Sequence, residues 1–388
     1  MIKRLLVSLL STLFLSGSAA FAEPIKIGMI TTLSGGGSAL GIAVRDGFQL
    51  AVDQEGGKLG GYPVELIVED DGRKPDKATQ IADRLIKRDK VQIMTGIIWS
   101  NLAIAVVPKV VRANVFYISP NAGPSLLAGK GCDRNYFNAA WQNDNLHEAM
   151  GQYVSNKGYT KVFILAPNYP AGRDALTGFK RFYKGEPVAE VYTKLGQKDY
   201  AAEIAAIRSA RPDAVFFFLP GGMGISFIKQ YNQAGLTKEI PLFGPAFSFD
   251  QTILSAVGEA ALGVMNSSQW SKDIDNPANK RFVADFKEAY GRLPSLYASQ
   301  GYDTARLIAS GIKAVGGDMS KKDDFREALV KADFDSVRGS FKFGPNHHPV
   351  QDIYIREVVE EDGVLTNRIV DKAFTNHSDA YVGECKMQ

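Results

Sequence analysis

"TGIIWSNLAIAVVPKVV", residues 95–111, changes character near its middle, and that change indicates the fold. Its first part is apolar and β-branched, like a buried strand, whereas the part from Leu102 onward has the pattern of a helix. The turn between the two parts carries Trp99, Ser100 and Asn101. The stretch therefore predicts one strand–turn–helix unit of an α/β protein.

The same unit repeats along the chain and restarts once, near residues 136–144. The predicted strands are continuous apolar runs, which is typical of a parallel sheet with helices on both faces. Strands are predicted at 25–33, 63–71, 91–99, 115–120, 161–168, 187–195, 213–220, 240–247 and 261–270. Three helices follow, at 278–291, 296–317 and 324–332. The C-terminal part, at 339–344 and 352–365, is predicted to form strands and a hairpin. We therefore expect two Rossmann-like lobes with parallel sheets.

Ligands of open parallel sheets bind at the carboxyl ends of the strands. If two such sheets face each other, the ligand lies between them. The loops at these ends are rich in Gly, Pro, Ser, Asn and aromatic residues; they span 32–41, 97–101, 118–123, 165–172, 218–224 and 244–250.

The N-terminal 22 residues have the three parts of a secretory signal peptide: a basic start, an apolar core and the small-x-small site Ala20–Phe21–Ala22. We expect cleavage after Ala22 and a periplasmic mature protein. Removing Lys3 and Arg4 lowers the net charge from +3 to +3 − 2 = +1. A nearly neutral, interspersed surface gives no indication of a nucleic-acid partner.

The chain has two cysteines, Cys132 and Cys385. Lone cysteines of an exported protein usually pair, so we predict a disulfide between them, with two free thiols as the alternative.

Catalytic and cofactor signatures are weak. The glycine-rich loop at 34–41 lacks the Lys-Ser/Thr ending of a phosphate-binding loop, and no GxSxG motif occurs.

His347 and His348 are adjacent, so in a strand they would face opposite ways; a surface turn is the simplest interpretation. None of the four histidines lies in the six loops. We expect no catalytic residue, metal or cofactor, and a monomer.

Six short segments in order resemble type I periplasmic solute-binding proteins of ABC importers, in the leucine/isoleucine/valine-binding branch. They are IKIGMITTLSG (25–35), GIIWSN (96–101), YISPNAG (117–123), APNYPAG (166–172), FLPGGMG (218–224) and FGPAF (243–247). The resemblance implies two lobes joined by a three-crossing hinge, with crossings near 138–141, 265–269 and 343–349. It places lobe 1 at 23–140 and 270–343, and lobe 2 at 141–269 and 344–388. It also implies delivery of the ligand to permease subunits in the membrane.

In this family a hydroxyl and backbone N–H groups in two loops usually hold the carboxylate of the ligand. Here Ser100 matches the first hydroxyl, and Ala122 and Gly123 lie in the second loop, where the family often has threonine at the position of Gly123. Asn121 or Asn101 would replace that hydroxyl. Ser100 is also a suitable helix N-cap, so a plain capping role stays open.

The ligand predicted by these residues is a carboxylate without an α-amine. Amino-acid binders of the family commonly have an acid at the position of Ala246, and an unpaired buried ammonium would be costly. Trp99, Tyr169, Phe247 and Phe249 provide flat apolar surface, although some of these rings are expected in the core. Leu40 and Pro220 complete the predicted lining. An aromatic acid suits these walls.

Two alternatives remain open. The protein could bind branched-chain or other amino acids, with an ammonium partner elsewhere. It could also belong to another class, as an exported α/β enzyme or a ligand-sensing domain.

Overall fold

The first sheet is built around β1 (Ile25–Thr31), an apolar strand that is buried along nearly its whole length. The structure is a computed structural model that describes residues 23–387, so the predicted signal peptide lies outside the described residues. Neighbouring strands run parallel in the order β2-β3-β1-β4-β5-β6, except for the antiparallel β2–β3 pair. The remaining strands are β2 (Lys58–Leu59), β3 (Tyr62–Asp70), β4 (Ile93–Thr95), β5 (Phe116–Ser119) and β6 (Tyr136–Asn138).

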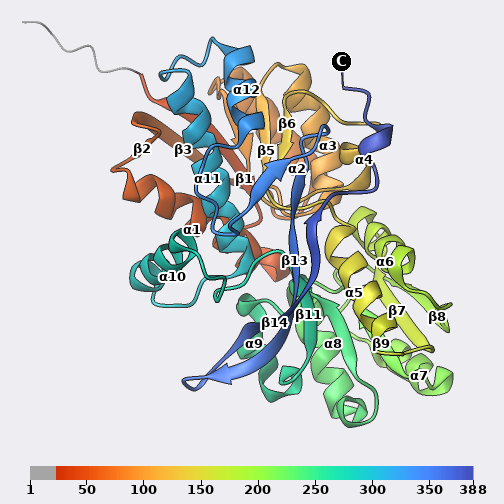
Figure 1. The fold of residues 1–388 in the computed structure, drawn as a ribbon. Helices are drawn as coiled ribbons and strands as arrows, with labels where there is room; N and C mark the ends of the chain where they lie inside the picture. Colours follow the sequence, from red (N-terminus) through yellow and green to blue (C-terminus); the bar gives the residue numbers. More distant parts are fainter. Residues whose placement is uncertain (1–22, 388) are drawn as a thin grey trace, which may run out of the picture.

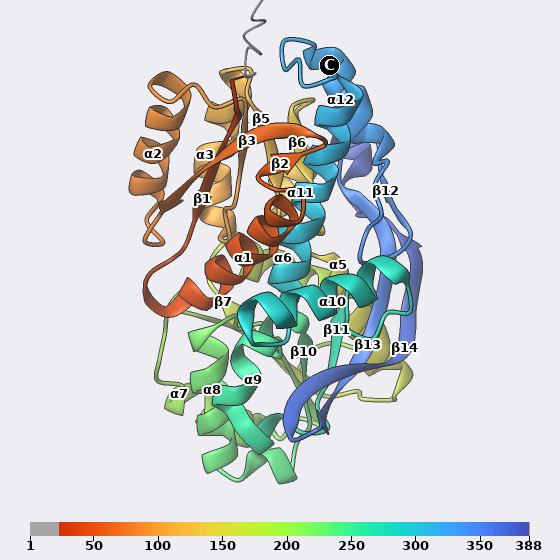
Figure 2. The same ribbon diagram turned by 90° about the vertical axis from the view of Figure 1, so that its left-hand side faces the viewer.

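Helices cover both faces of this sheet (Figure 2). Helices α1 and α11 pack together on one side, and α2 packs against α3 on the other. Pro75 begins α2, a position where its missing N–H costs no helical hydrogen bond. The helices of this lobe are α1 (Ser38–Gln54), α2 (Pro75–Lys87), α3 (Ser100–Arg112), α4 (Ser125–Ala128), α10 (Pro277–Tyr290), α11 (Leu296–Ala314) and α12 (Lys322–Lys331).

The second sheet lies below the first in Figure 1 and has the order β12-β13-β11-β10-β9-β7-β8, with β14 paired to β13. Its strands β7 to β11 are parallel, and the long β13 runs antiparallel to β11, β12 and β14. The strands are β7 (Val162–Pro167), β8 (Ala189–Thr193), β9 (Ala214–Phe217), β10 (Leu242–Pro245), β11 (Met265–Ser268), β12 (Phe341–Phe343), β13 (Pro349–Glu361) and β14 (Val364–His377). The helices are α5 (Asn145–Asn156), α6 (Pro170–Phe182), α7 (Ala201–Ala210), α8 (Gly222–Gln233) and α9 (Gln251–Val257). Two lobes of parallel-rich sheets confirm the predicted fold class.

The chain passes between the lobes after β6, after β11 and between β12 and β13. The first and third passages are joined directly, because the N–H of Asn138 donates to the carbonyl of His347 at 3.0 Å. β12, at residues assigned to lobe 1, pairs with β13 of the second sheet. This pairing arises because β13 extends along both lobes (Figure 1), so its first residues lie beside lobe 1. The domain limits therefore stay a prediction.

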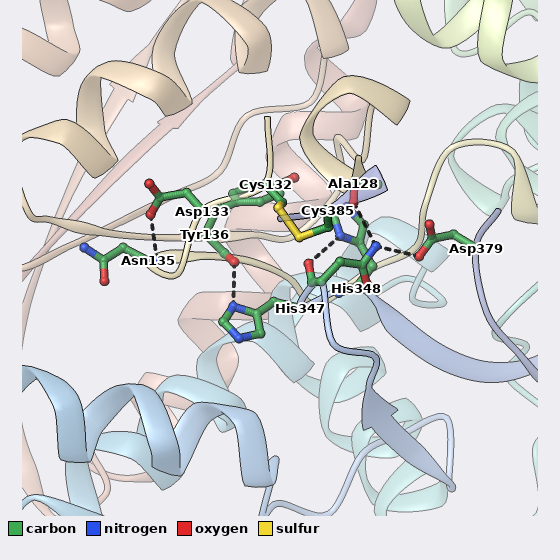
Figure 3. The surroundings of a disulfide bond; sticks show 10 residues. Ala128, Cys132, Asp133, Asn135, Tyr136, His347, His348, Asp379 and Cys385 are labelled. Carbon is green, nitrogen blue, oxygen red and sulfur yellow. Dashed lines mark hydrogen bonds between the residues drawn. A yellow bond between two sulfur atoms is a disulfide. The ribbon is translucent and has the colours of Figure 1, made fainter. Parts of the chain in front are cut away.

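The C-terminal tail returns to the first lobe and is fixed there by a disulfide (Figure 3). Cys132 and Cys385 are bonded, with their Cα atoms 5.6 Å apart, as the predicted pairing requires. Next to the bond, the Nδ2 of Asn346 donates to the carbonyl of Ala128 at 3.0 Å and to Asp379 at 2.9 Å. The third passage, the loop after β5 and the tail are thus connected at one place.

The two adjacent histidines lie at a turn, as predicted, but the prediction of a surface position is wrong. His347 and His348 are only 6% and 0% exposed, and Figure 3 shows both near the disulfide. The His347 ring stacks on Phe137 at 4.0 Å, and its Nδ1–H donates to the carbonyl of Tyr136 at 3.2 Å. Burial lowers the pKa of His347 to about 4. The tail covers this segment, which local sequence could not indicate.

In residues 23–387, no helix combines the length and apolar character needed to cross a membrane.

Candidate ligand-binding site

A small cavity lies between the lobes, at the carboxyl ends of strands from both sheets. The residues that line it are Leu40, Ile98, Trp99, Ser100, Asn121, Ala122, Trp141, Asn143, His147, Tyr169, Ala171, Phe218, Pro220, Phe247 and Tyr297.

The start of α3 offers three hydrogen-bond donors toward this cavity. Trp99 is the N-cap of α3 and makes no side-chain cap, so Ser100 is the first helical residue and not the cap. The simple capping role of Ser100 is therefore wrong. Within residues 23–387, the N–H groups of Ser100 and Asn101 have no protein partner. The Oγ of Ser100 accepts from Asn143 Nδ2 at 3.1 Å, which leaves its own proton free to donate.

The second predicted loop contributes less than expected. The N–H of Gly123 is already bonded to Asn143 Oδ1 at 3.2 Å, and Gly123 does not line the cavity. A Cβ at this position would lie 2.1 Å from the carbonyl oxygen of Trp141. The backbone therefore leaves no room here for a side chain such as the threonine that the resemblance implies. Asn121 does line the cavity, but its Nδ2 donates to the carbonyl of Ile98 at 2.6 Å.

Asn143 connects this donor set to an acid behind the cavity wall. Its Nδ2 also donates to Asp174 in α6 at 2.8 Å. Asp174 further accepts from the N–H and the Oγ of Ser125 in the first lobe, at 3.0 and 2.7 Å. Three donors therefore occupy its carboxylate, and the bonds from Ser125 join the two lobes beside the cavity.

Aromatic rings form a continuous wall from the first lobe to the first passage. The ring of Trp99 lies 6.2 Å from Tyr169, which lies 6.3 Å from Phe218. Phe218 contacts Phe247 at 5.6 Å, and Phe247 contacts Trp141 at 4.6 Å. Contacts at these separations add about 0.5–1.5 kcal/mol each beyond burial. The wall is therefore suited to a flat apolar ligand.

The cavity has no ionised lining. Within the described part of the chain, none of its lining residues is Asp, Glu, Lys or Arg. Positive charge is nevertheless close, because the guanidinium of Arg73 lies 5.2 Å from the centre of the Trp99 ring. Asp250, the acid nearest in sequence to Ala246, accepts from the N–H groups of Thr252 and Leu296, both at 3.0 Å, and so caps α9.

Most of the residues predicted for the site lie together around the cavity. Those that line it are Leu40, Trp99, Ser100, Asn121, Ala122, Tyr169, Pro220 and Phe247. Asn101, Gly123 and Ala246 do not, although each of them is next in sequence to a lining residue. Phe249 is a core ring that contacts Phe217. Sequence reasoning missed Ile98, Trp141, Asn143, His147, Ala171, Phe218 and Tyr297.

Replacing Ser100 by alanine should weaken carboxylate binding by about 1.5–3 kcal/mol, because it removes a hydrogen bond to a charged group. That loss is about 10- to 150-fold in the dissociation constant, measurable by calorimetry. The free energy of unfolding should fall by about 1–3 kcal/mol, because Ser100 makes no cap but its Oγ accepts a buried hydrogen bond from Asn143.

Ser310→Ala is the matched control. Its hydroxyl donates to Leu307 in α11 at 2.8 Å, and Ser310 does not line the cavity. Equal losses of affinity in the two variants would contradict the assignment of Ser100.

Comparisons with known proteins agree with this architecture. The family model described as "Periplasmic binding protein" matches residues 24–363. The Leu/Ile/Val-binding protein homolog 6 of Brucella melitensis is 30% identical over 380 residues, covering 94% of this chain and 96% of that protein.

Two solved structures are also similar. An ABC transporter solute-binding protein from R. palustris, in complex with benzoate, has a TM-score of 0.88 and 34% identity, covering 94% of this chain and 99% of that one. The corresponding protein of Rhodopseudomonas palustris BisB5, in complex with 3,4-dihydroxybenzoic acid, has a TM-score of 0.85 and 31% identity, covering 92% and 99%. These relatives are solute-binding transport proteins. The resemblance stated from the six segments is confirmed, and the chain belongs to the periplasmic binding protein family.

Proposed function

We propose that this protein is the substrate-binding component of an ABC transporter, and that it captures an aromatic carboxylic acid without an α-amine between its lobes. The observation that carries the proposal is the combination of free donors at the start of α3 with a ring-lined cavity that has no ionised side chain among the described residues. The bound acid is then delivered to permease subunits in the membrane.

The carboxylate end is assigned to Ser100. Its hydroxyl proton and the N–H groups of Ser100 and Asn101 are positioned at the positive end of the α3 dipole, which favours an anion. Arg73 adds positive charge near the same end, where Trp99 lies. An anion can be held here without an ion pair in the cavity.

The positions of the acidic side chains near the cavity are the reason to expect a ligand without an α-amine. An ammonium group needs an acceptor of negative charge when it is buried. Asp174 is the acid connected to the cavity lining through Asn143, and its carboxylate already accepts from three donors. Asp250 is likewise bonded to two backbone N–H groups. Neither of these acids lines the cavity, so neither is placed to pair with an ammonium held there.

The relatives support two ligand classes. The two Rhodopseudomonas structures contain benzoate and 3,4-dihydroxybenzoic acid, which are aryl acids without an amine. The name of the Brucella relative favours the second candidate, a branched-chain amino-acid binder. The cavity chemistry of this chain favours the first.

The proposal also states in which compartment the protein acts and in which oligomeric state. A periplasmic binding protein acts outside the inner membrane, which agrees with export by a signal peptide cleaved after Ala22. We propose a monomer with neither enzymatic activity nor cofactor. A ligand-sensing domain would use the same cavity, and transport of the ligand by the intact system would distinguish the two roles.

The proposal is tested by one pair of ligands that differ in the amine alone. Calorimetry on the mature protein should find that phenylpropanoate binds more than tenfold tighter than phenylalanine, because the ammonium would be desolvated without a partner. Leucine and valine should bind weakly for the same reason. Tight binding of any of these amino acids, with weak binding of phenylpropanoate and benzoate, would show that an ammonium site exists and that the proposal is wrong.

A further inference from the structure

A histidine that the carboxylate site does not use lies in the wall of the cavity. His147 is the third residue of α5 in the second lobe, lines the cavity and is only 1% exposed. Ser100, in contrast, belongs to the first lobe. A ligand held between the lobes therefore meets both residues.

The surroundings of His147 are aromatic. Its ring contacts Phe218 at 5.0 Å and Phe216 at 5.8 Å, both nearly edge-on, and Phe247 at 5.9 Å. Phe218 and Phe247 belong to the wall that would receive the aryl ring of the ligand. The imidazole is thus placed where the aromatic part of the ligand is expected.

Both ring nitrogens of His147 lack a protein partner. Nδ1 is fully enclosed and unbonded, and no group among residues 23–387 bonds Nε2. Burial lowers the pKa of His147 to about 3, so the ring is neutral at neutral pH and has one donor and one acceptor. Leaving a buried polar group unpaired is unfavourable, so a polar group at this point of the ligand would be stabilised.

We infer that His147 is a specificity-determining residue that recognises a hydroxyl group on the aromatic ring of the ligand. The inference rests on the proposed function and narrows it to hydroxylated aryl carboxylic acids. Because Nδ1 is enclosed, Nε2 is the nitrogen that a ligand can reach, and a hydroxyl can either donate to it or accept from it, whichever tautomer the neutral imidazole adopts. The carboxylate has its own donors at α3, so the hydroxyl belongs to the ring of the ligand.

The test compares benzoate with 3-hydroxybenzoate and 4-hydroxybenzoate by calorimetry. At least one hydroxylated acid should bind the unmodified protein about 3- to 10-fold tighter than benzoate, the gain expected for one hydrogen bond. In His147→Phe this ratio should fall to about one, because the ring is kept and both nitrogens are lost. The ratio is taken within each variant, so a general loss of affinity cancels.

The matched control is His348→Gln. His348 is also fully buried with an unpartnered Nε2, but it lies at the third passage and outside the cavity, so the ratio should be retained. A ratio near one in the unmodified protein, or an unchanged ratio in His147→Phe, would overturn the role of His147. Failure of these three acids and of phenylpropanoate to bind would instead refute the proposed function.

If His147→Phe does not fold, the inference can be tested on the unmodified protein instead. The chain has four histidines, so isotope-labelled imidazole nitrogens can be followed by magnetic resonance. The better-bound hydroxylated acid should shift one buried imidazole nitrogen that benzoate leaves unshifted. Identical spectra with the two ligands would overturn the inference.

Discussion

Replacing Asp303 by alanine should lower the free energy of unfolding by about 3–5 kcal/mol, the cost of leaving one partner of a buried ion pair alone. Asp303 in α11 accepts from the Nε of Arg338 at 3.0 Å, and both side chains are almost completely buried. Its carboxylate also accepts from the hydroxyl of Ser336 and the N–H of Val337, at 2.6 and 3.0 Å. Urea unfolding of the mature protein measures the change.

Loss of Asp303 would also affect the other groups to which Arg338 is hydrogen-bonded. Its guanidinium donates to the carbonyls of Ala139 and Ala140 in the first passage, at 2.6 and 3.0 Å. It also donates to Gln351 of β13 at 2.8 Å. Asp303 therefore holds the guanidinium that joins the first and third passages between the lobes.

An exposed pair provides the control. Lys280 and Asp275 are 2.6 Å apart, closer than Arg338 and Asp303, but both side chains are largely exposed to solvent. Asp275→Ala should therefore change the free energy of unfolding far less than Asp303→Ala, because water replaces the lost partner. Equal effects of the two substitutions would show that Arg338 is not dependent on Asp303.

Much of the fold could be predicted because its signals are local. Apolar runs such as residues 25–31 must be covered on both faces, and Pro75 can begin a helix but not continue one. The pairing of β12 with β13 could not be predicted in the same way. It depends on how far β13 extends past the second sheet, and no local sequence pattern indicates the length of this strand.

The same distinction between local and long-range signals applies to the residues of the site. Residues in the turns after parallel strands, such as Ser100 and Tyr169, could be predicted because topology brings those turns to one edge. His147 and Tyr297 could not. They lie in the first turns of α5 and α11, which follow a passage between the lobes and another helix, and they reach the cavity only through the packing of the lobes. Asn143 lies in a passage between the lobes, and its bonds to Ser100 and Asp174 join segments distant in sequence.

The role of Ser100 shows why residue type alone is insufficient. Serine is favoured at N-caps, and the sequence left that role open. If Ser100 were the cap, α3 would begin at Asn101, but in the structure α3 begins at Ser100. The hydroxyl oxygen of Ser100 accepts a hydrogen bond from Asn143 and does not cap the helix. A shift of one residue thus changes a structural side chain into a candidate ligand donor.

Removing the disulfide should destabilise the protein by about 5 kcal/mol in the chain-entropy model, because the bond closes a very long loop. Cys132 and Cys385 are separated by 253 residues, so the bond constrains the unfolded chain from Cys132 almost to its C-terminus. The double variant Cys132→Ser/Cys385→Ser, unfolded in urea, measures the loss. The unmodified protein should lose the same amount when it is reduced.

The tail also has bonds of its own, and a second variant separates their contribution from that of the disulfide. Asn346→Ala removes the bonds to Ala128 and Asp379 while leaving the cysteines paired. If the loop constraint dominates, this variant should lose about 1–3 kcal/mol, the cost of unpaired buried groups, and remain well above the double serine variant. If instead Asn346→Ala loses as much as the double serine variant, local packing of the tail carries the stability and the entropic argument is wrong.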